Sequence, residues 1–107
     1  MDTDLMMWDG FSGKAYEFWV FGLKKKFGRF GAVFIYAQQN AKTGFDMMYI
    51  NQTDRMDLVA SNPIAEFVLQ EYKPDCLHIL KCDDIADRKR AMSDLIVRYN
   101  PPGNRMS

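Results

Sequence analysis

Three side chains in the last third of the chain have the types that bind zinc, namely Cys76, His78 and Cys82. The run Cys-Leu-His-Ile-Leu-Lys predicts a strand, on which all three would face one side. The two cysteines are then roughly 20 Å apart at about 3.3 Å per residue, too far to ligate one ion. We therefore predict a buried sheet face, no metal site and two reduced thiols without a disulfide.

Two groups of aspartates offer carboxylates that could bind a cation. Asp84 lies at a helix start with Asp87 three residues beyond, and Asp83 precedes them, which favours a capped helix over a cation site. Asp54 and Asp57 are expected in a solvated loop. If Mg²⁺ or Mn²⁺ were bound at all, these last two would be its ligands, because hard cations take oxygen donors.

Two clusters of basic residues could contact a nucleic-acid backbone. They are Lys24, Lys25, Lys26 and Arg29 in a loop, and Arg88, Lys89 and Arg90 on a helix. Phe27 and Phe30, interleaved with the loop cluster, could stack on bases. However, 14 basic residues equal 14 acidic residues, and zero net charge provides no long-range attraction to phosphate. Two solvated surfaces, with the phenylalanines turned inward, are the favoured interpretation, and nucleic-acid binding stays open.

Hydrophobic periodicity predicts the elements that must position these groups. The expected strands are Tyr16–Leu23, Ala32–Gln38, Met47–Asn51 and Cys76–Lys81, and the expected helices are 63–73 and 85–99. Residues 1–13 are interpreted as a loose lead-in, and Asp94 and Arg98 as an ion pair one turn apart. Residues 1–107 are thus expected to form one α+β domain, with a small antiparallel three-stranded central sheet, an extra N-terminal strand and flanking helices.

Composition and the distribution of charge indicate where this domain is located in the cell. The chain is 48% hydrophobic and 14% aromatic, enough for a folded core rather than disorder. No apolar run approaches the ~20 residues of a membrane-spanning helix. The first ten residues carry Asp2, Asp4 and Asp9 without a basic residue, unlike a secretory signal. We therefore predict a cytoplasmic protein without a membrane partner.

Two segments carry a more specific signal. The first is Ala-Val-Phe-Ile-Tyr at 32–36 followed by Met-Tyr-Ile-Asn-Gln-Thr-Asp at 48–54, and the second is Asp-Leu-Ile-Val-Arg-Tyr-Asn-Pro-Pro-Gly-Asn at 94–104. With Trp8, Ser-Gly-Lys at 12–14 and Tyr-Glu-Phe at 16–18, they make residues 8–105 similar to the GIY-YIG nuclease superfamily, in particular its small stand-alone bacterial members.

This resemblance implies a fold whose family members carry out metal-assisted phosphodiester hydrolysis. It also implies that most of the family's active-site residues are replaced in this chain. The family's two tyrosines, arginine, histidine and metal-binding glutamate fall on Phe34, Tyr49, Val59, Pro63 and Met92. Only Tyr49 is retained. A thioether cannot hold Mg²⁺, and loss of one charge-stabilising donor costs about 10²–10³-fold in rate. The resemblance thus implies that the catalytic residues are lost.

We therefore expect a non-catalytic binding or interaction module that needs no cofactor. Its candidate surface is the former cleft lined by Phe34, Tyr49, Val59 and Met92, which suits a protein partner or self-association. Binding of nucleic acid through the loop at 24–29 is a variant of this hypothesis.

The alternative is an active metal-dependent DNA endonuclease with relocated ligands. It would combine Tyr49 with Asp54 or Asp57 and with Arg55 or Arg88, around Mg²⁺ or Mn²⁺. These side chains would have to converge on the Tyr49 hydroxyl.

Overall fold

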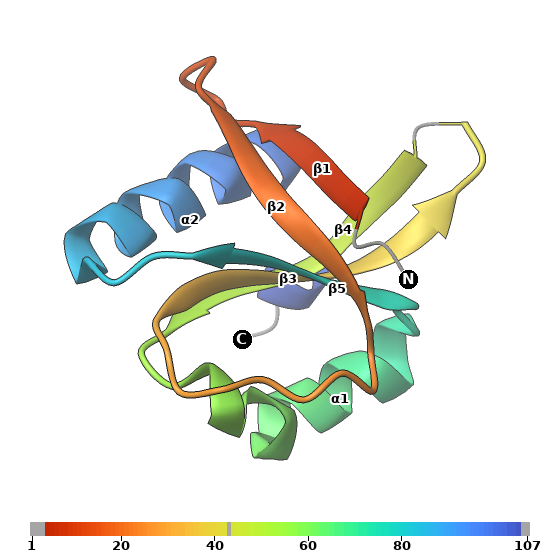
Figure 1. Cartoon of the computed structure of the whole chain (residues 1–107). Helices are drawn as coiled ribbons and strands as arrows, with labels where there is room; N and C mark the ends of the chain where they lie inside the picture. The colour runs from red at the N-terminus through yellow and green to blue at the C-terminus, as the bar shows by residue number, and fades with distance from the viewer. Residues whose placement is uncertain (1–3, 43, 106–107) are drawn as a thin grey trace.

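Five antiparallel strands form one curled sheet in the computed structural model, which describes residues 4–42 and 44–105 (Figure 1). The strands are β1 (Asp4–Asp9), β2 (Ala15–Gly22), β3 (Ala32–Asn40), β4 (Gly44–Thr53) and β5 (Cys76–Lys81). Their order across the sheet is β1-β2-β5-β3-β4. The helices are α1 (Pro63–Tyr72) and α2 (Ile85–Tyr99), with short 3₁₀ helices η1 (Met56–Ser61) and η2 (Pro102–Arg105).

The α+β class is confirmed, but the sheet is larger than expected. Instead of a three-stranded centre with one extra strand, β1 and β2 both extend the sheet beyond β5. The loose lead-in expected over 1–13 is wrong for residues 4–9, which form β1, while residues 1–3 lie outside the described residues. The strand forms because Trp8 can bury its ring opposite Tyr16, and Gly13, with a φ of 91°, turns the chain back into β2.

Helices α1 and α2 cover opposite faces of the sheet (Figure 1), and each face carries its own core. Helix α2 packs on one face against Val33, Ile35 and Ile50. Helices α1 and η1 pack on the opposite face, against Phe34 and Tyr36. The two sets alternate along β3 because successive strand side chains point to opposite faces. With both faces covered, residues 32–37 are all buried.

The predicted helix starts are confirmed by their caps. The Asn62 side chain accepts a hydrogen bond from the Ile64 amide at 2.9 Å, and Pro63 occupies the first helical position. The Asp84 carboxylate accepts from the Asp87 amide at 3.0 Å at the start of α2. Asp84 therefore acts as a helix cap, as the sequence predicted.

The expected ion pair between Asp94 and Arg98 is wrong. Asp94 instead accepts hydrogen bonds from the Ser12 amide (2.8 Å), the Ser12 hydroxyl (2.6 Å) and the Tyr16 hydroxyl (2.8 Å). Gly10 permits this approach, because a Cβ there would collide with the Asp94 carboxylate. Hydrogen bonds from Ser12 lower the Asp94 pKa, and burial raises the Tyr16 pKa to about 12. Asp94 thus holds the β1–β2 turn against α2.

One outer edge of the sheet is closed by the C-terminal segment. The Asn104 side chain on η2 accepts from the Ile50 amide at 2.8 Å and donates to the Ile50 carbonyl at 2.7 Å. These bonds satisfy outward-facing backbone groups of β4, which would otherwise present a free edge. Among residues 4–42 and 44–105, the structure contains no helix of the length and hydropathy needed to cross a membrane.

Candidate binding pocket

A pocket of about 250 Å³ lies on the α1 face of the sheet, between the end of β4, η1 and the start of α1. Its floor is aromatic and its walls are aliphatic, with polar groups gathered along the β4 side. The lining residues are Phe34, Tyr36, Tyr49, Asn51, Gln52, Thr53, Asp54, Arg55, Leu58, Val59, Asn62, Ile64 and Ala65.

The pocket floor consists of three aromatic rings from neighbouring strands. Phe34 and Tyr36 are two residues apart on β3, so both point to the α1 face. Tyr49 lies directly opposite Tyr36 on β4, with the ring centroids 6.4 Å apart. The Phe34 and Tyr36 rings meet edge to face at 6.0 Å. The sheet therefore supplies a rigid base to the pocket.

The two floor tyrosines have different hydrogen-bond environments. The Tyr49 hydroxyl accepts from the Asn51 side-chain amide at 2.7 Å. Burial raises the pKa of Tyr36 to about 12 and also raises the pKa of Tyr49, because a phenolate would be poorly solvated there. Both hydroxyls therefore keep their protons at neutral pH and can donate hydrogen bonds.

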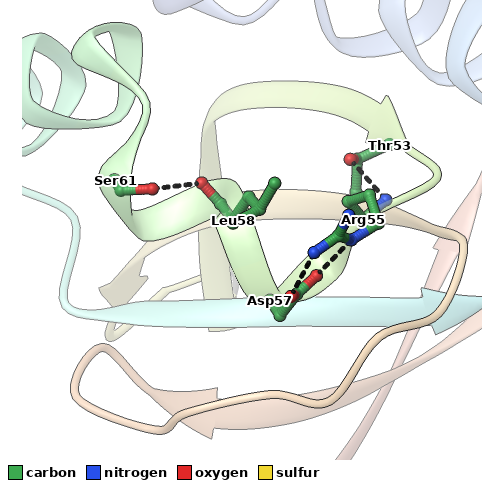
Figure 2. Close-up of polar contacts among 5 residues, drawn as sticks. All are labelled: Thr53, Arg55, Asp57, Leu58 and Ser61. Carbon is green, nitrogen blue, oxygen red and sulfur yellow. Dashed lines mark hydrogen bonds and ion pairs between the residues drawn. The ribbon is translucent and has the colours of Figure 1, made fainter.

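The rim of the pocket carries two charged side chains, Arg55, which is paired with Asp57, and the exposed Asp54. Arg55 donates to both Asp57 carboxylate oxygens at 2.9 and 2.8 Å, and its amide donates to the Thr53 hydroxyl (Figure 2). The hydrogen bonds between them raise the Arg55 pKa and lower the Asp57 pKa. At the other end of η1, the Ser61 hydroxyl donates to the Leu58 carbonyl (Figure 2). The pair orients the guanidinium and offsets its charge.

The structure brings together three of the five positions implied by the GIY-YIG resemblance. Phe34, Tyr49 and Val59 all line the pocket. Met92 does not, because α2 covers the opposite face of the sheet and Met92 packs into the core there. A cleft that includes Met92 is therefore wrong for this fold. Pro63 lies outside the lining as the first residue of α1.

The basic cluster on α2 is not a free cationic surface. Arg88 is only 3% exposed and donates to the Gln52 side chain and to the Cys82 and Asp83 carbonyls. It faces the sheet, which excludes it as a backbone contact for nucleic acid. Arg90 pairs with Asp87, whereas Lys89 is exposed.

The basic loop between β2 and β3 does expose its cations. Lys24, Lys25, Lys26 and Arg29 are all exposed. Phe27 and Phe30, in contrast, are half-buried and pack with Phe21 against the core of the α1 face. The rings thus anchor the loop instead of presenting faces on which bases could stack.

The buried sheet face expected for Cys76 and His78 is confirmed. The Trp8 indole N–H donates to His78 Nδ1 at 3.0 Å, and His78 Nε2 lies 3.4 Å from Cys76 Sγ. Burial lowers the His78 pKa to about 4, so the imidazole is neutral near pH 7. Cys82 is half-buried and donates to the Asp84 carbonyl.

The carboxylates of the nuclease alternative are only partly brought together. Asp54 lines the same pocket as Tyr49 and Arg55, whereas Asp57 is outside the lining and is engaged by Arg55. In the part of the chain that the structure describes, no three His, Cys, Asp or Glu side chains are arranged to hold a metal ion.

Sequence reasoning missed three important residues of the pocket. Tyr36 could have been found, because it lies two residues beyond Phe34 on the same predicted strand and must share its face. Leu58 and Ile64 carried no such signal. They reach the pocket only because η1 and α1 fold back over the end of β4.

Comparison of the chain with protein-family models, with curated proteins and with solved structures finds no match.

Proposed function

We propose that this protein is a non-catalytic binding module on a GIY-YIG-like fold, and that the pocket beside α1 receives part of a protein partner. The observation that carries the proposal is the apolar rim of this pocket. Leu58 is 50% exposed and Ile64 is 45% exposed, although both line a cavity with buried aromatic rings at its floor. Exposed apolar residues around a concave site are typical of recognition surfaces.

The chemistry of the walls supports binding rather than hydrolysis. Val59 occupies the position of the family's arginine and places an aliphatic group in the pocket. Arg55, which supplies the guanidinium in the lining, is engaged by Asp57. A phosphodiester undergoing cleavage would need a free cation or a metal ion to stabilise its developing charge.

A protein partner is favoured over nucleic acid by the distribution of cations. Arg88 is buried and Arg90 is paired, so of the two predicted basic clusters only the loop at 24–29 and Lys89 expose cations outside an ion pair. The pocket rim combines exposed aliphatic side chains with the Arg55–Asp57 ion pair and the Asp54 carboxylate, so it carries no free cation. Such a rim suits an apolar protein surface better than a phosphate backbone. We place this interaction in the cytoplasm, where both free cysteines would stay reduced.

Selection from a display library of random peptides tests this proposal. We expect the wild-type protein to enrich peptides whose binding is lost in Val59→Arg, which fills the pocket with a long charged side chain. The matched control is Val97→Arg, an exposed position on α2. It should retain binding. The proposal would be refuted if no peptides are enriched, or if the enriched peptides bind Val59→Arg as well as they bind the wild type. It would also be refuted if the protein forms a dimer that Val59→Arg disrupts.

The endonuclease alternative is tested by incubating plasmid, single-stranded and branched DNA with Mg²⁺ or Mn²⁺. We expect no cleavage. Cleavage that disappears in Tyr49→Phe would refute the non-catalytic proposal, because that variant removes only the retained phenolic oxygen from the pocket floor.

A further inference from the structure

The Tyr36 side chain is buried, but its hydroxyl forms no hydrogen bond with any of the described residues. The side chain is only 3% exposed, and no group within the described ranges forms a hydrogen bond with its hydroxyl. No fully buried side-chain nitrogen or oxygen in the same ranges lacks a partner. The hydroxyl must therefore keep contact with solvent, and the pocket that Tyr36 lines is the route to it.

Tyr49 places a second hydroxyl at the same floor. Its oxygen already accepts from Asn51, which leaves its own proton free to donate. Burial raises the pKa values of both tyrosines, so both remain donors throughout the physiological range. The floor thus offers two O–H donors, framed by the Phe34 ring and by aliphatic walls.

The size and charge of the pocket limit which chemical group of a ligand can fit into it. A cavity of about 250 Å³ has room for a single ring. The floor carries no charge. At the rim Arg55 is offset by Asp57, and the exposed Asp54 adds a negative charge. A nucleobase would bring a phosphate into the neighbourhood of this pair without a free cation to receive it. An uncharged ring that carries an oxygen meets both the apolar walls and the donors.

We propose that the pocket binds the side chain of a tyrosine on a protein partner, with the ring between Val59 and Ala65 and its hydroxyl hydrogen-bonded to Tyr36. This inference rests on the proposed function and specifies its ligand. Phenylalanine fills the same volume but leaves the Tyr36 hydroxyl without a partner when water is excluded. A site that provides a hydrogen-bonding group discriminates against an analogue that lacks it.

The experiment compares three probes by NMR titration of isotope-labelled protein: N-acetyl-tyrosinamide, N-acetyl-phenylalaninamide and uridine. We expect tyrosinamide to shift the methyl signals of Val59, Ile64 and Ala65, and to bind about tenfold more tightly than phenylalaninamide, the ratio for one hydrogen bond. In Tyr36→Phe that preference should disappear while the apolar contribution to binding remains. Tyr72→Phe removes a phenol outside the pocket lining and should keep the preference.

Each contrary result has a distinct meaning. Equal binding of the two amides, tighter binding of uridine, shifts confined to another surface, or no shift up to the solubility limit would overturn the tyrosine assignment. If display-selected peptides still require an open pocket but lack tyrosine, the binding module stands and only this assignment fails. If no peptide depends on the pocket, both fail.

Discussion

Acidification should destabilise this protein well above the pH at which its carboxylates protonate, because His78 is buried as a neutral imidazole. It accepts a hydrogen bond from the Trp8 indole, which can only donate, so Nδ1 must be unprotonated in the folded state. Burial lowers the His78 pKa from 6.5 to about 4, a shift that the nearby charge of Asp75 opposes in part. Protonation would place a cation among aromatic side chains.

The sign of the effect follows from proton binding. Between pH 6.5 and about 4 the unfolded chain binds a proton at His78 that the folded chain does not, so stability falls as the pH falls through this window. The loss is about 2 kcal/mol between pH 7 and pH 5, and roughly 3 kcal/mol once the folded-state pKa is passed. Below the folded-state pKa this contribution to the pH dependence levels off.

Urea denaturation at several pH values from 7 to 4 measures this loss. His78 is the only histidine in the chain, so its imidazole carbon signals in NMR report its pKa without ambiguity. His78→Gln is the matched variant, since an amide can occupy the same hydrogen bonds and does not titrate. A His78 pKa near 6.5, or an equal loss of stability in the variant between pH 7 and 5, would refute the argument.

Substitutions at three further positions test contacts that hold the fold together, each by denaturant unfolding. Arg88→Met should lower the free energy of unfolding by about 2–4 kcal/mol, because buried acceptors lose their donor; an unchanged midpoint would contradict this role. Asn104→Ala should cost about 1–3 kcal/mol by leaving both Ile50 backbone groups unpaired, whereas Asn104→Asp should keep only the bond from the amide. Gly10→Ala should cost about 1–3 kcal/mol, because its methyl group collides with Asp94; full stability would mean that the turn moves freely.

Only some of the positions implied by the GIY-YIG resemblance line the pocket. The hairpin of β3 and β4 brings Phe34 and Tyr49 to one face, where Val59 joins them. Met92 lies on the other face of the sheet. The positions that the resemblance implies therefore do not share one surface in this chain. The proposed binding site is built instead from two strands, η1 and the start of α1.

Local sequence was sufficient for elements whose signals lie within a few residues of one another. Asn62 and Pro63 mark the start of α1, and Asp84 marks the start of α2, because a cap bonds to backbone groups two or three residues away. The apolar run at 32–36 likewise predicted a strand, and the structure places Val33 and Ile35 on one of its faces and Phe34 on the other.

Tertiary structure alone decided which polar and charged groups are available to a ligand. Arg88 donates a hydrogen bond to Gln52, 36 residues away, and Asp94 accepts one from Ser12, 82 residues away. Among the described residues, no group forms a hydrogen bond with the Tyr36 hydroxyl, although the Tyr49 ring lies opposite on the neighbouring strand. Such pairings depend on the order of strands and on which face each helix covers, and residue spacing along the chain does not specify either of these.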